Sequence, residues 1–281
     1  MISEWVVRQH ESAEGFLDRA EAWLLETEAE HNLLLGLTAQ LREGDHDYEP
    51  PIYLATIESQ GRVEGSAFRT PPLKLGLTRL PLDALPALVE DIAGVYDTLP
   101  AVLGPPHVAE RFAQLWSERS GTPQRLAMRQ RIFSLSRVRP ASRAVPGELR
   151  VAEAADLPLV CAWGEAFERD AGVFSGSSNA LMTRLVSRGA VYLWCDEEIR
   201  CMAAAMAPTP NGVRIGFVYT PDALRGRGYA TACTRAATQR LLDAGRRFCF
   251  LYTDLANPTS NAIYERIGYE PICDVVDYDF A

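Results

Sequence analysis

The second half of the chain contains short apolar or alternating stretches bounded by turn residues, a pattern typical of β-strands. The turn Asp196-Glu197-Glu198 separates two of these stretches, which predicts a hairpin, and Thr220-Pro221 ends a third. Strands are predicted over residues 190–195, 199–207, 213–219, 248–253 and 274–280.

Helical patterns lie between these strands. In a helix predicted over 156–170, Asp156 stands at the cap position, and Trp163 and Phe167 lie four residues apart on one face. Two further helices are predicted over residues 228–244 and 258–267, each followed by a glycine. Strands and helices in this order predict an α+β fold with a mixed sheet.

A faint repeat relates the two halves of the chain. Three short segments recur in the same order about 139 residues later: Tyr53-Leu54 as Tyr192-Leu193, Thr70-Pro71-Pro72 as Pro208-Thr209-Pro210, and Pro81-Leu82-Asp83-Ala84-Leu85 as Pro221-Asp222-Ala223-Leu224. Residues 139–147 contain two prolines and several small residues, which is typical of a linker. We therefore predict two copies of one fold, over residues 1–138 and 148–281, joined by a linker over 139–147.

Charge and composition exclude several classes of protein. The 281 residues include 28 Lys and Arg against 37 Asp and Glu, a net charge of −9, which argues against a nucleic-acid-binding protein. No apolar run reaches the ~20 residues that span a bilayer, and the N-terminal residues lack the pattern of a signal peptide. A cytoplasmic protein without a membrane partner is expected, and its oligomeric state stays open.

Cysteine and histidine usage restricts the chemistry further. No two of the six cysteines have C-x-x-C spacing, so no metal site is predicted and the thiols are interpreted as buried. All four histidines lie in the first half, at His10, His31, His46 and His107. Chemistry confined to the second half must therefore proceed without imidazole, which excludes Ser-His-Asp and Cys-His mechanisms there.

The segment from Arg225 to Thr231, Arg-Gly-Arg-Gly-Tyr-Ala-Thr, joins a predicted strand to a helix. Glycine at such a junction lets backbone N–H groups approach a phosphate, and the first turn of the helix adds unpaired donors and the positive end of the helix dipole. Neither the P-loop lysine nor the third glycine of a dinucleotide fingerprint is present. The segment predicts a phosphate cradle of another kind.

A second motif follows the strand at 248–253. Asn257 precedes Pro258 and can cap a helix, and Tyr264 lies seven residues further on, about two turns along the same side. By itself this pattern is typical of a capped helix whose tyrosine packs in the core.

Together the two motifs resemble the GNAT superfamily of acyl-CoA-dependent N-acyltransferases. That family carries R/Q-x-x-G-x-G/A and, some thirty residues later, an Asn and a Tyr seven apart on a helix ending in Gly-Phe/Tyr, here Arg225 to Ala230, Asn257, Tyr264 and Gly268-Tyr269. The resemblance is strong over 190–281, reasonable from 148 and only topological over 1–138. It implies a mostly antiparallel sheet flanked by helices and a direct acetyl transfer from acetyl-CoA to a small-molecule or peptide amine.

The same resemblance implies a role for each residue of the two motifs. Three strand residues would lie along the pantetheine arm, the cradle would wrap the pyrophosphate, Asn257 would contact the CoA arm, and Tyr264 would protonate the leaving thiolate. The residues implied to bind the cofactor are Phe217, Val218, Tyr219, Arg225, Gly226, Arg227, Gly228, Tyr229, Ala230, Thr231 and Asn257.

The general base is not assigned by the sequence. Many family members have a Glu five residues before the Asn, where this chain has Tyr252. Asp254, Glu165 and Asp170 are nearby candidates, although carboxylates of this kind are more often surface or capping residues. In the first half, Glu90 and Asp91 follow the corresponding helix start, which has no glycine, and they are expected to repel a pyrophosphate.

Two alternatives to acetyl transfer stay open. The missing base allows an acyl-CoA-binding regulatory protein without turnover. The C-terminal motif also resembles the glycine N-acyltransferase-like branch, which implies a transferase for longer acyl groups.

Overall fold

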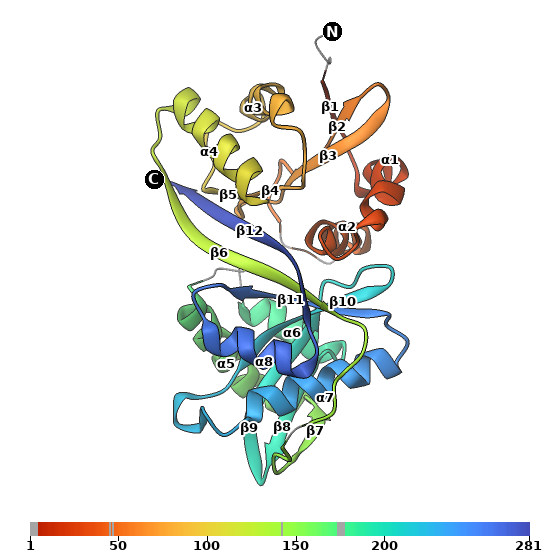
Figure 1. Ribbon diagram of the computed structural model, residues 1–281, viewed down its shortest axis with the longest axis vertical. Helices are drawn as coiled ribbons and strands as arrows, with labels where there is room; N and C mark the ends of the chain where they lie inside the picture. Colours follow the sequence, from red (N-terminus) through yellow and green to blue (C-terminus); the bar gives the residue numbers. More distant parts are fainter. Residues whose placement is uncertain (1–4, 45, 47, 142, 173–177) are drawn as a thin grey trace. The chain divides into compact units, whose positions relative to one another are not determined.

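The computed structural model describes residues 5–44, 46, 48–141, 143–172 and 178–281, and the chain forms two compact units. The first unit contains Met1–Ile132, Asp254–Ala256 and Ile272–Ala281. The second contains Phe133–Thr253 and Asn257–Pro271. Figure 1 labels the elements of both.

The two halves of the chain have the same order of elements. The first half has β1 (Val6–Gln9), α1 (Ala13–Glu26), α2 (Asn32–Glu43), β2 (Tyr53–Ser59), β3 (Arg62–Arg69), β4 (Leu75–Leu77), the 3₁₀ turn η1 (Leu82–Ala84), α3 (Leu85–Ala93), β5 (Ala101–Gly104), α4 (Pro106–Ser120) and β6 (Gln124–Leu135). The second half has β7 (Glu148–Val151), η2 (Ala154–Asp156), α5 (Leu157–Ala171), α6 (Ser178–Ser187), β8 (Val191–Asp196), β9 (Glu198–Met206), β10 (Gly212–Tyr219), η3 (Asp222–Leu224), α7 (Tyr229–Asp243), β11 (Phe248–Asp254), α8 (Pro258–Ile267) and β12 (Glu270–Phe280). Apart from η2, each element has a counterpart, so the predicted duplication is confirmed.

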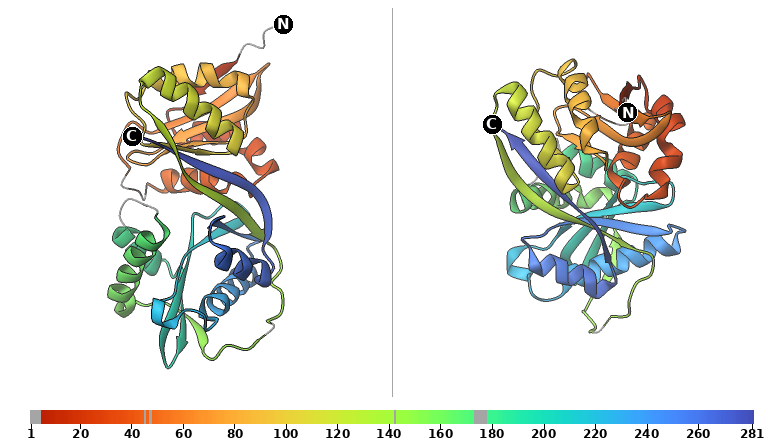
Figure 2. Two further views of the ribbon diagram at one scale, coloured as in Figure 1. Left: turned by 60° about the vertical axis from the view of Figure 1, so that its left-hand side comes forward. Right: turned by 45° about the horizontal axis from the view of Figure 1, so that its top comes forward.

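In the first unit the strands follow the order β1-β2-β3-β4-β5-β12-β6. β4 and β5 pair in parallel, whereas β1–β2, β2–β3, β3–β4 and β5–β12 pair antiparallel. Alternate residues of β2 face opposite layers: Tyr53, Ala55 and Ile57 pack with α3 and α4, and Leu54 packs with α1 and α2. Figure 2 shows these two helical layers on either face of the sheet.

The second unit repeats this arrangement with the strand order β11-β10-β9-β8-β7. The corresponding pair β10–β11 is parallel, and the pairs β9–β10, β8–β9 and β7–β8 are antiparallel. Tyr192 and Trp194 of β8 pack with α7 and α8, and Leu193 between them packs with α5 and α6. Each unit is therefore a mostly antiparallel sheet between two helical layers, as predicted.

The observed division differs from the predicted boundaries in the last strand of each half. Phe133 and Leu135, at the end of β6, belong to the core of the second unit, whereas Ile272–Phe280 of β12 belong to the first. In the first unit β12 pairs with β5, Val276 lying opposite Gly104. The first half thus ends in a strand whose last residues belong to the second unit, and the second half ends in a strand that belongs mostly to the first. Apolar alternation along the chain does not reveal this.

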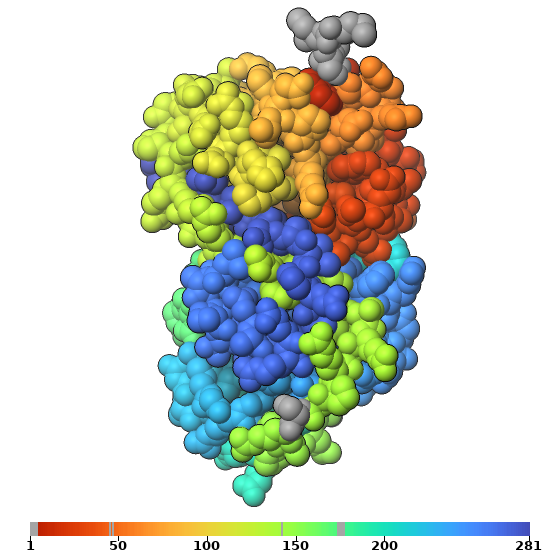
Figure 3. Space-filling model, in the orientation of Figure 1, coloured from red at the N-terminus to blue at the C-terminus, as the bar shows by residue number. Residues whose placement is uncertain are grey.

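The predicted linker 139–147 forms neither helix nor strand in its described residues, and it packs on the second unit. The Arg139 N–H donates to the Ile267 carbonyl at 2.8 Å, and the Trp194 indole N–H donates to the Pro146 carbonyl at 2.8 Å. In the space-filling view this yellow-green segment lies against the blue atoms of α8 (Figure 3). Its described residues are part of the second unit's surface.

The predicted strands and helices of the second half are present, with two differences of detail. β12 begins at Glu270, four residues earlier than predicted. Asp156 is at the N-cap position of α5 but does not cap it with its side chain: that carboxylate accepts hydrogen bonds from the Arg150 guanidinium and the Glu153 N–H instead. An ion pair with a strand residue therefore replaces the predicted cap.

The cysteines are all free thiols, but only three are buried. These are Cys201, Cys233 and Cys249, whereas Cys161, Cys195 and Cys273 are half-buried. The expectation that all six are buried is therefore wrong for three of them.

Candidate functional site

The centre of the second unit's sheet contains a β-bulge in β10. The register with β9 shifts between Gly216 and Tyr219, and Phe217 has a φ of +48°, which is rare for a bulky residue. The bulge changes which face the side chains occupy: Ile215 and Val218 pack with α7 and α8, whereas Phe217 packs on the opposite face. The backbone of the predicted pantetheine-binding residues is thus released from regular pairing with β9.

The two parallel strands at this point separate. β10 and β11 pair only at their beginnings, Gly212 with Phe248 through Arg214 with Phe250. β10 continues to Tyr219 and β11 to Asp254. The last five residues of β10 therefore present backbone N–H and C=O groups at an edge that β11 does not cover, where an extended ligand can pair with them.

The Arg-Gly-Arg-Gly segment forms the turn between η3 and α7. Gly226 and Gly228 have φ values of +78° and +93°, which favour glycine, and Gly228 is the N-cap of α7 without a side-chain cap. The first turn closes where the Ala232 N–H donates to the Gly228 carbonyl, so the preceding amides have no acceptor within the helix. A Cβ at Gly226 would meet open space, and one at Gly228 would lie 3.1 Å from Val145 Cγ2. This backbone has the conformation that a phosphate-binding turn needs.

Arg225 differs from the role expected of its side chain. Its guanidinium contacts the Thr220 carbonyl at 3.0 Å, the Asp170 carboxylate at 2.6 Å and the Asp222 carboxylate at 2.8 Å. These contacts raise the pKa of Arg225, chiefly through the hydrogen bond to Asp170. The side chain thus ties the turn to α5 and to the end of β10, and Arg227, which is exposed, carries the freer cation of the turn.

The side chain of Tyr229 also lies away from the turn. It is buried in the core beneath α7, and its hydroxyl donates to Asp196 at 2.7 Å. The group of Tyr229 that a phosphate can reach is its backbone N–H, at the start of α7. Ala230 and Thr231 follow in the same first turn, each half-buried.

Asn257 and Tyr264 lie at the start and near the end of α8. The Asn257 side-chain oxygen accepts a hydrogen bond from the Ser260 N–H at 3.1 Å, which is the predicted capping interaction, and Asn257 is exposed. Tyr264 packs against the same core as Val218 and Ala230. The structure therefore brings the bulge, the first turn of α7 and the predicted catalytic tyrosine to one face of the sheet.

Burial raises the pKa of Tyr264 well above the ordinary value for tyrosine, with a smaller contribution from Cys201. Its ring lies edge-on to Tyr269 with the centroids 6.0 Å apart. Within the described part of the chain, no protein group hydrogen-bonds the Tyr264 hydroxyl, so this proton is available to a ligand. A phenol that stays protonated at neutral pH can act as a proton donor.

Each of the three candidate bases is already engaged. Asp170 binds Arg225, Glu165 accepts a hydrogen bond from Asn179 at 2.8 Å, and Asp254 accepts one from the Ala256 N–H at 2.8 Å. None of these contacts points to a base, and the assignment stays open. Among the described residues, no group of three or more His, Cys, Asp or Glu side chains is placed to hold a metal ion.

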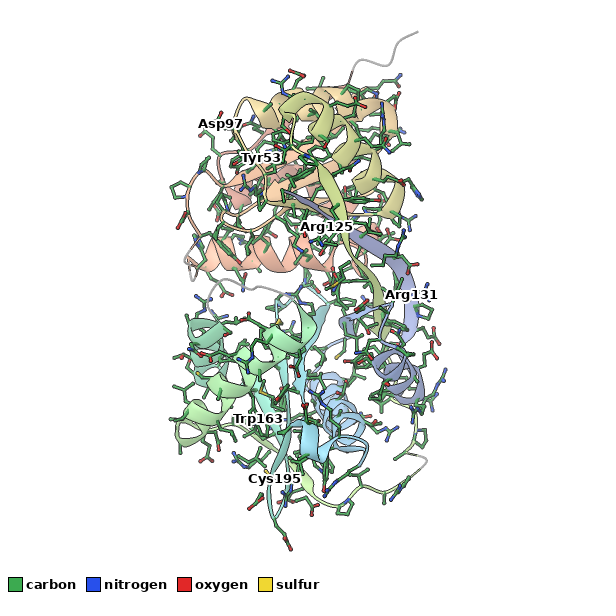
Figure 4. All side chains as sticks on the ribbon, turned by 90° about the vertical axis from the view of Figure 1, so that its left-hand side faces the viewer. Tyr53, Asp97, Arg125, Arg131, Trp163 and Cys195 are labelled. Atoms are coloured by element: carbon green, nitrogen blue, oxygen red, sulfur yellow. The ribbon has the colours of Figure 1, made fainter. Side chains whose placement is uncertain are left out.

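Trp163 on α5, labelled in Figure 4, is a neighbour of the site, although the sequence patterns did not connect it with the motifs. Its ring lies 5.7 Å from that of Tyr219, and Phe167 one turn later lies 4.9 Å from Phe217. The pairing of Trp163 and Phe167 on one helical face was predicted, but their contact with the bulge depends on tertiary structure. This aromatic face fixes the bulged end of β10.

Comparison with known families supports the assignment of the second half. Residues 194–276, which include the bulge, the glycine turn and α8, match the model of the family described as FR47-like protein. No curated protein matches the sequence.

Solved structures are similar over nearly the whole chain. A Drosophila protein is 13% identical with a TM-score of 0.69, and 99% of each chain is covered. A GCN5-related N-acetyltransferase from Sphaerobacter thermophilus is 14% identical with a TM-score of 0.62, covering 98% of this chain and 94% of that one. A tandem GNAT protein from the clavulanic acid biosynthesis pathway is 12% identical with a TM-score of 0.52, covering 98% of both chains.

Proposed function

We propose that this chain, which has a duplicated GNAT-type fold, is a member of the GNAT superfamily and an N-acetyltransferase. In this proposal the second unit transfers an acetyl group from acetyl-CoA to a small-molecule or peptide amine in the cytoplasm. Among the described helices, none combines the length and the apolar character needed to cross a membrane.

The observation that carries the proposal is the separation of β10 from β11 beside the bulge. An acyl-pantetheine arm can lie along the open edge and pair with the backbone of Phe217, Val218 and Tyr219. The pyrophosphate then falls at the start of α7, where backbone N–H groups from Gly226 to Thr231 and the helix dipole favour an anion. Asn257 would contact the arm from the start of α8.

The reaction needs a neutral amine held next to the thioester. The amine nitrogen attacks the carbonyl carbon, the C–N bond forms, the C–S bond breaks, and the amine loses a proton to solvent or to a base not yet identified. Tyr264 would donate its proton to the departing sulfur and regain one from solvent. An amine with a pKa near ~10.4 is neutral in about one molecule in 2,500 at pH 7, a cost of roughly 4.6 kcal/mol, so deprotonation contributes a large part of the barrier.

The test is to incubate the full-length protein with acetyl-CoA and a panel of amines while free thiol is measured. Thiol release that depends on one amine, together with the acetylated amine in the mass spectrum, is the expected result. Binding of acetyl-CoA without thiol release across the panel would instead favour a regulatory protein. Competition with longer acyl-CoAs in the same assay determines the acyl length.

A further inference from the structure

The first unit contains a hollow of about 410 Å³ beside the end of α1. Clefts that bind small molecules have volumes of ~300–1,000 Å³, so the space is sufficient for a small organic ligand. The hollow opens to solvent and combines aromatic, acidic and basic side chains. The side chains on which the argument depends are Trp23, Glu26, Glu30, His31, Glu64 and Arg79.

The lining of this hollow is negatively charged. Three carboxylates, those of Glu26, Glu30 and Glu64, face one guanidinium. That guanidinium, of Arg79, pairs with Glu30 at 2.7 Å, so the charges of Glu26 and Glu64 are left over. A cationic ligand is favoured by this balance, and an anion such as a phosphate is disfavoured.

His31 adds a hydrogen-bond acceptor to the lining. The side chain is buried, with only 5% of the residue exposed. Its Nδ1 lies 2.9 Å from the Leu24 carbonyl oxygen, so Nδ1 carries the proton that it donates there, and Nε2 of the neutral ring is left with a lone pair. Burial lowers the pKa of His31, which keeps the ring neutral at pH 7. Within the described residues Nε2 has no protein partner, and the ring lines the hollow.

The cation that fits these groups is organic. The described residues contain no group of three His, Cys, Asp or Glu side chains placed to hold a metal ion, and the acidic groups of the hollow are no exception. Trp23, stacked on His31 with 4.7 Å between ring centroids, offers an apolar face to the body of a ligand. A protonated primary amine has three donors, which match carboxylate oxygens and an imidazole lone pair.

We propose that the hollow is a binding site for an organic ammonium ion, a protonated primary amine on an aromatic or alkyl body. The site belongs to the first unit alone, and it does not depend on the proposed acetyl transfer. The first unit is then a ligand-binding module, although it lacks the glycine turn of the second.

The test is calorimetric titration of the full-length protein with phenethylammonium chloride at low ionic strength. Phenethyl alcohol, which has the same body without the charge, is the comparison ligand. We expect phenethylammonium to bind and phenethyl alcohol not to bind. Added salt should lower the affinity for the ammonium ion. Equal binding of the two ligands would overturn the proposal.

Charge variants assign the binding to the hollow. Glu26→Gln and Glu64→Gln remove exposed carboxylates from the lining, and each should lower the affinity for the ammonium ion about two- to fivefold. Glu118→Gln, an exposed residue of α4 that does not line the hollow, should leave the affinity unchanged. Wild-type affinity in both lining variants would show that the cation binds elsewhere.

Two further variants distinguish binding in the hollow from a folding defect and from binding in the second unit. Arg79→Gln removes the competing cation and should raise the affinity for the ammonium ion by a similar factor. A folding defect cannot produce such a gain. Gly228→Glu, which alters the glycine turn of the second unit, should leave ammonium binding intact. Weaker binding in Arg79→Gln would contradict the proposed charge recognition, and loss of binding in Gly228→Glu would place the amine in the second unit.

Discussion

The two halves of the chain differ most where a strand is followed by its next helix. In the second half four residues, Arg225–Gly228, separate η3 from α7, and both glycines have positive φ. In the first half η1 continues directly into α3: Ala84 is right-handed helical, and Pro86 occupies the first turn. The first half therefore has the same helix without the turn that would present its amides to a phosphate.

The strand before that helix differs as well. Thr78, directly after β4, is tied to β3, because its N–H donates to the Ser66 carbonyl at 3.0 Å and its hydroxyl oxygen accepts from the Ser66 N–H at 2.7 Å. A Cβ at Gly65 would lie 2.4 Å from Leu80 Cβ, so the same segment also packs closely on β3. The backbone that the bulge frees in β10 is thus occupied in the first unit.

The expected repulsion by Glu90 and Asp91 is not the reason for this difference. Both lie in the second half of α3, away from its start. The Glu90 carboxylate pairs with Arg119 at 2.7 Å, and the Asp91 carboxylate accepts a hydrogen bond from the Tyr53 hydroxyl at 2.6 Å. The comparison teaches that the first unit keeps the core of this region but lacks the four-residue turn that we propose as the phosphate site of the second.

The largest effect should come from Gly228→Glu. The substitution forces a side chain onto a residue with a φ of +93° and places a carboxylate where backbone must approach a pyrophosphate. Charge-assisted hydrogen bonds contribute ~1.5–3 kcal/mol each, so the loss of two should lower the CoA affinity, measured by calorimetry, at least ~100-fold. Gly245→Glu is the matched control, since Gly245 has a φ of +97° after the end of α7. Unchanged CoA affinity in folded Gly228→Glu would remove the cofactor assignment.

Tyr264→Phe should affect turnover and leave binding alone. It deletes one hydroxyl and keeps the ring against Tyr269, so CoA affinity should stay within a few-fold. Turnover should fall ~100-fold if the hydroxyl donates a proton to the leaving sulfur. Steady-state kinetics under conditions where chemistry limits the rate is the measurement.

Tyr269→Phe is the control for that variant. The Tyr269 hydroxyl lies 2.8 Å from the Thr238 hydroxyl in the core, and its removal should lower the free energy of unfolding by about 1 kcal/mol while turnover is retained. Full activity in Tyr264→Phe, or equal loss in both variants, would return Tyr264 to a packing role.

The rate of acetyl transfer should rise with pH, and ionisation of the Tyr264 hydroxyl should not cause a decline at alkaline pH. A donor must be protonated, and because burial raises the pKa of Tyr264, the hydroxyl keeps its proton through the range in which the acceptor amine becomes neutral. For an amine with a pKa near ~10.4, kcat/KM should increase about tenfold per pH unit from about pH 7 to about pH 9.5. A decline in that range that disappears in Tyr264→Phe would contradict the raised pKa.

Local patterns predicted the fold better than the site. The strand at 213–219 and the glycine turn after it follow from residue types, because apolar alternation and glycine have local structural consequences. The bulge at Phe217 does not, since a positive φ at a bulky residue is imposed by packing with Phe167 and with β9. The passage of β12 into the first unit, and of the last residues of β6 into the second, was equally invisible, because both depend on contacts between residues far apart in the sequence.

The contact between Arg225 and Asp170 joins residues 55 positions apart, and it leads to the smallest predicted effect. Both side chains are about half exposed, at 51% and 48%, so the pair is worth little in stability, but its carboxylate neutralises a cation beside the glycine turn. The Thr220 carbonyl and Asp222 still hold Arg225 when that carboxylate is removed. Asp170→Asn should therefore tighten CoA about two- to fivefold at low ionic strength, and the gain should vanish in high salt.

Glu30→Gln sharpens this last comparison. Glu30 is also an acidic residue paired with an arginine, Arg79 at 2.7 Å, but it lies in the first unit. Its loss should leave CoA affinity unchanged, because the first unit has no glycine turn. Weaker CoA binding in Asp170→Asn would mean that the ion pair mainly positions the turn. An equal gain in affinity in Glu30→Gln would mean that the overall charge of the protein sets the CoA affinity, and not the charge beside Arg225.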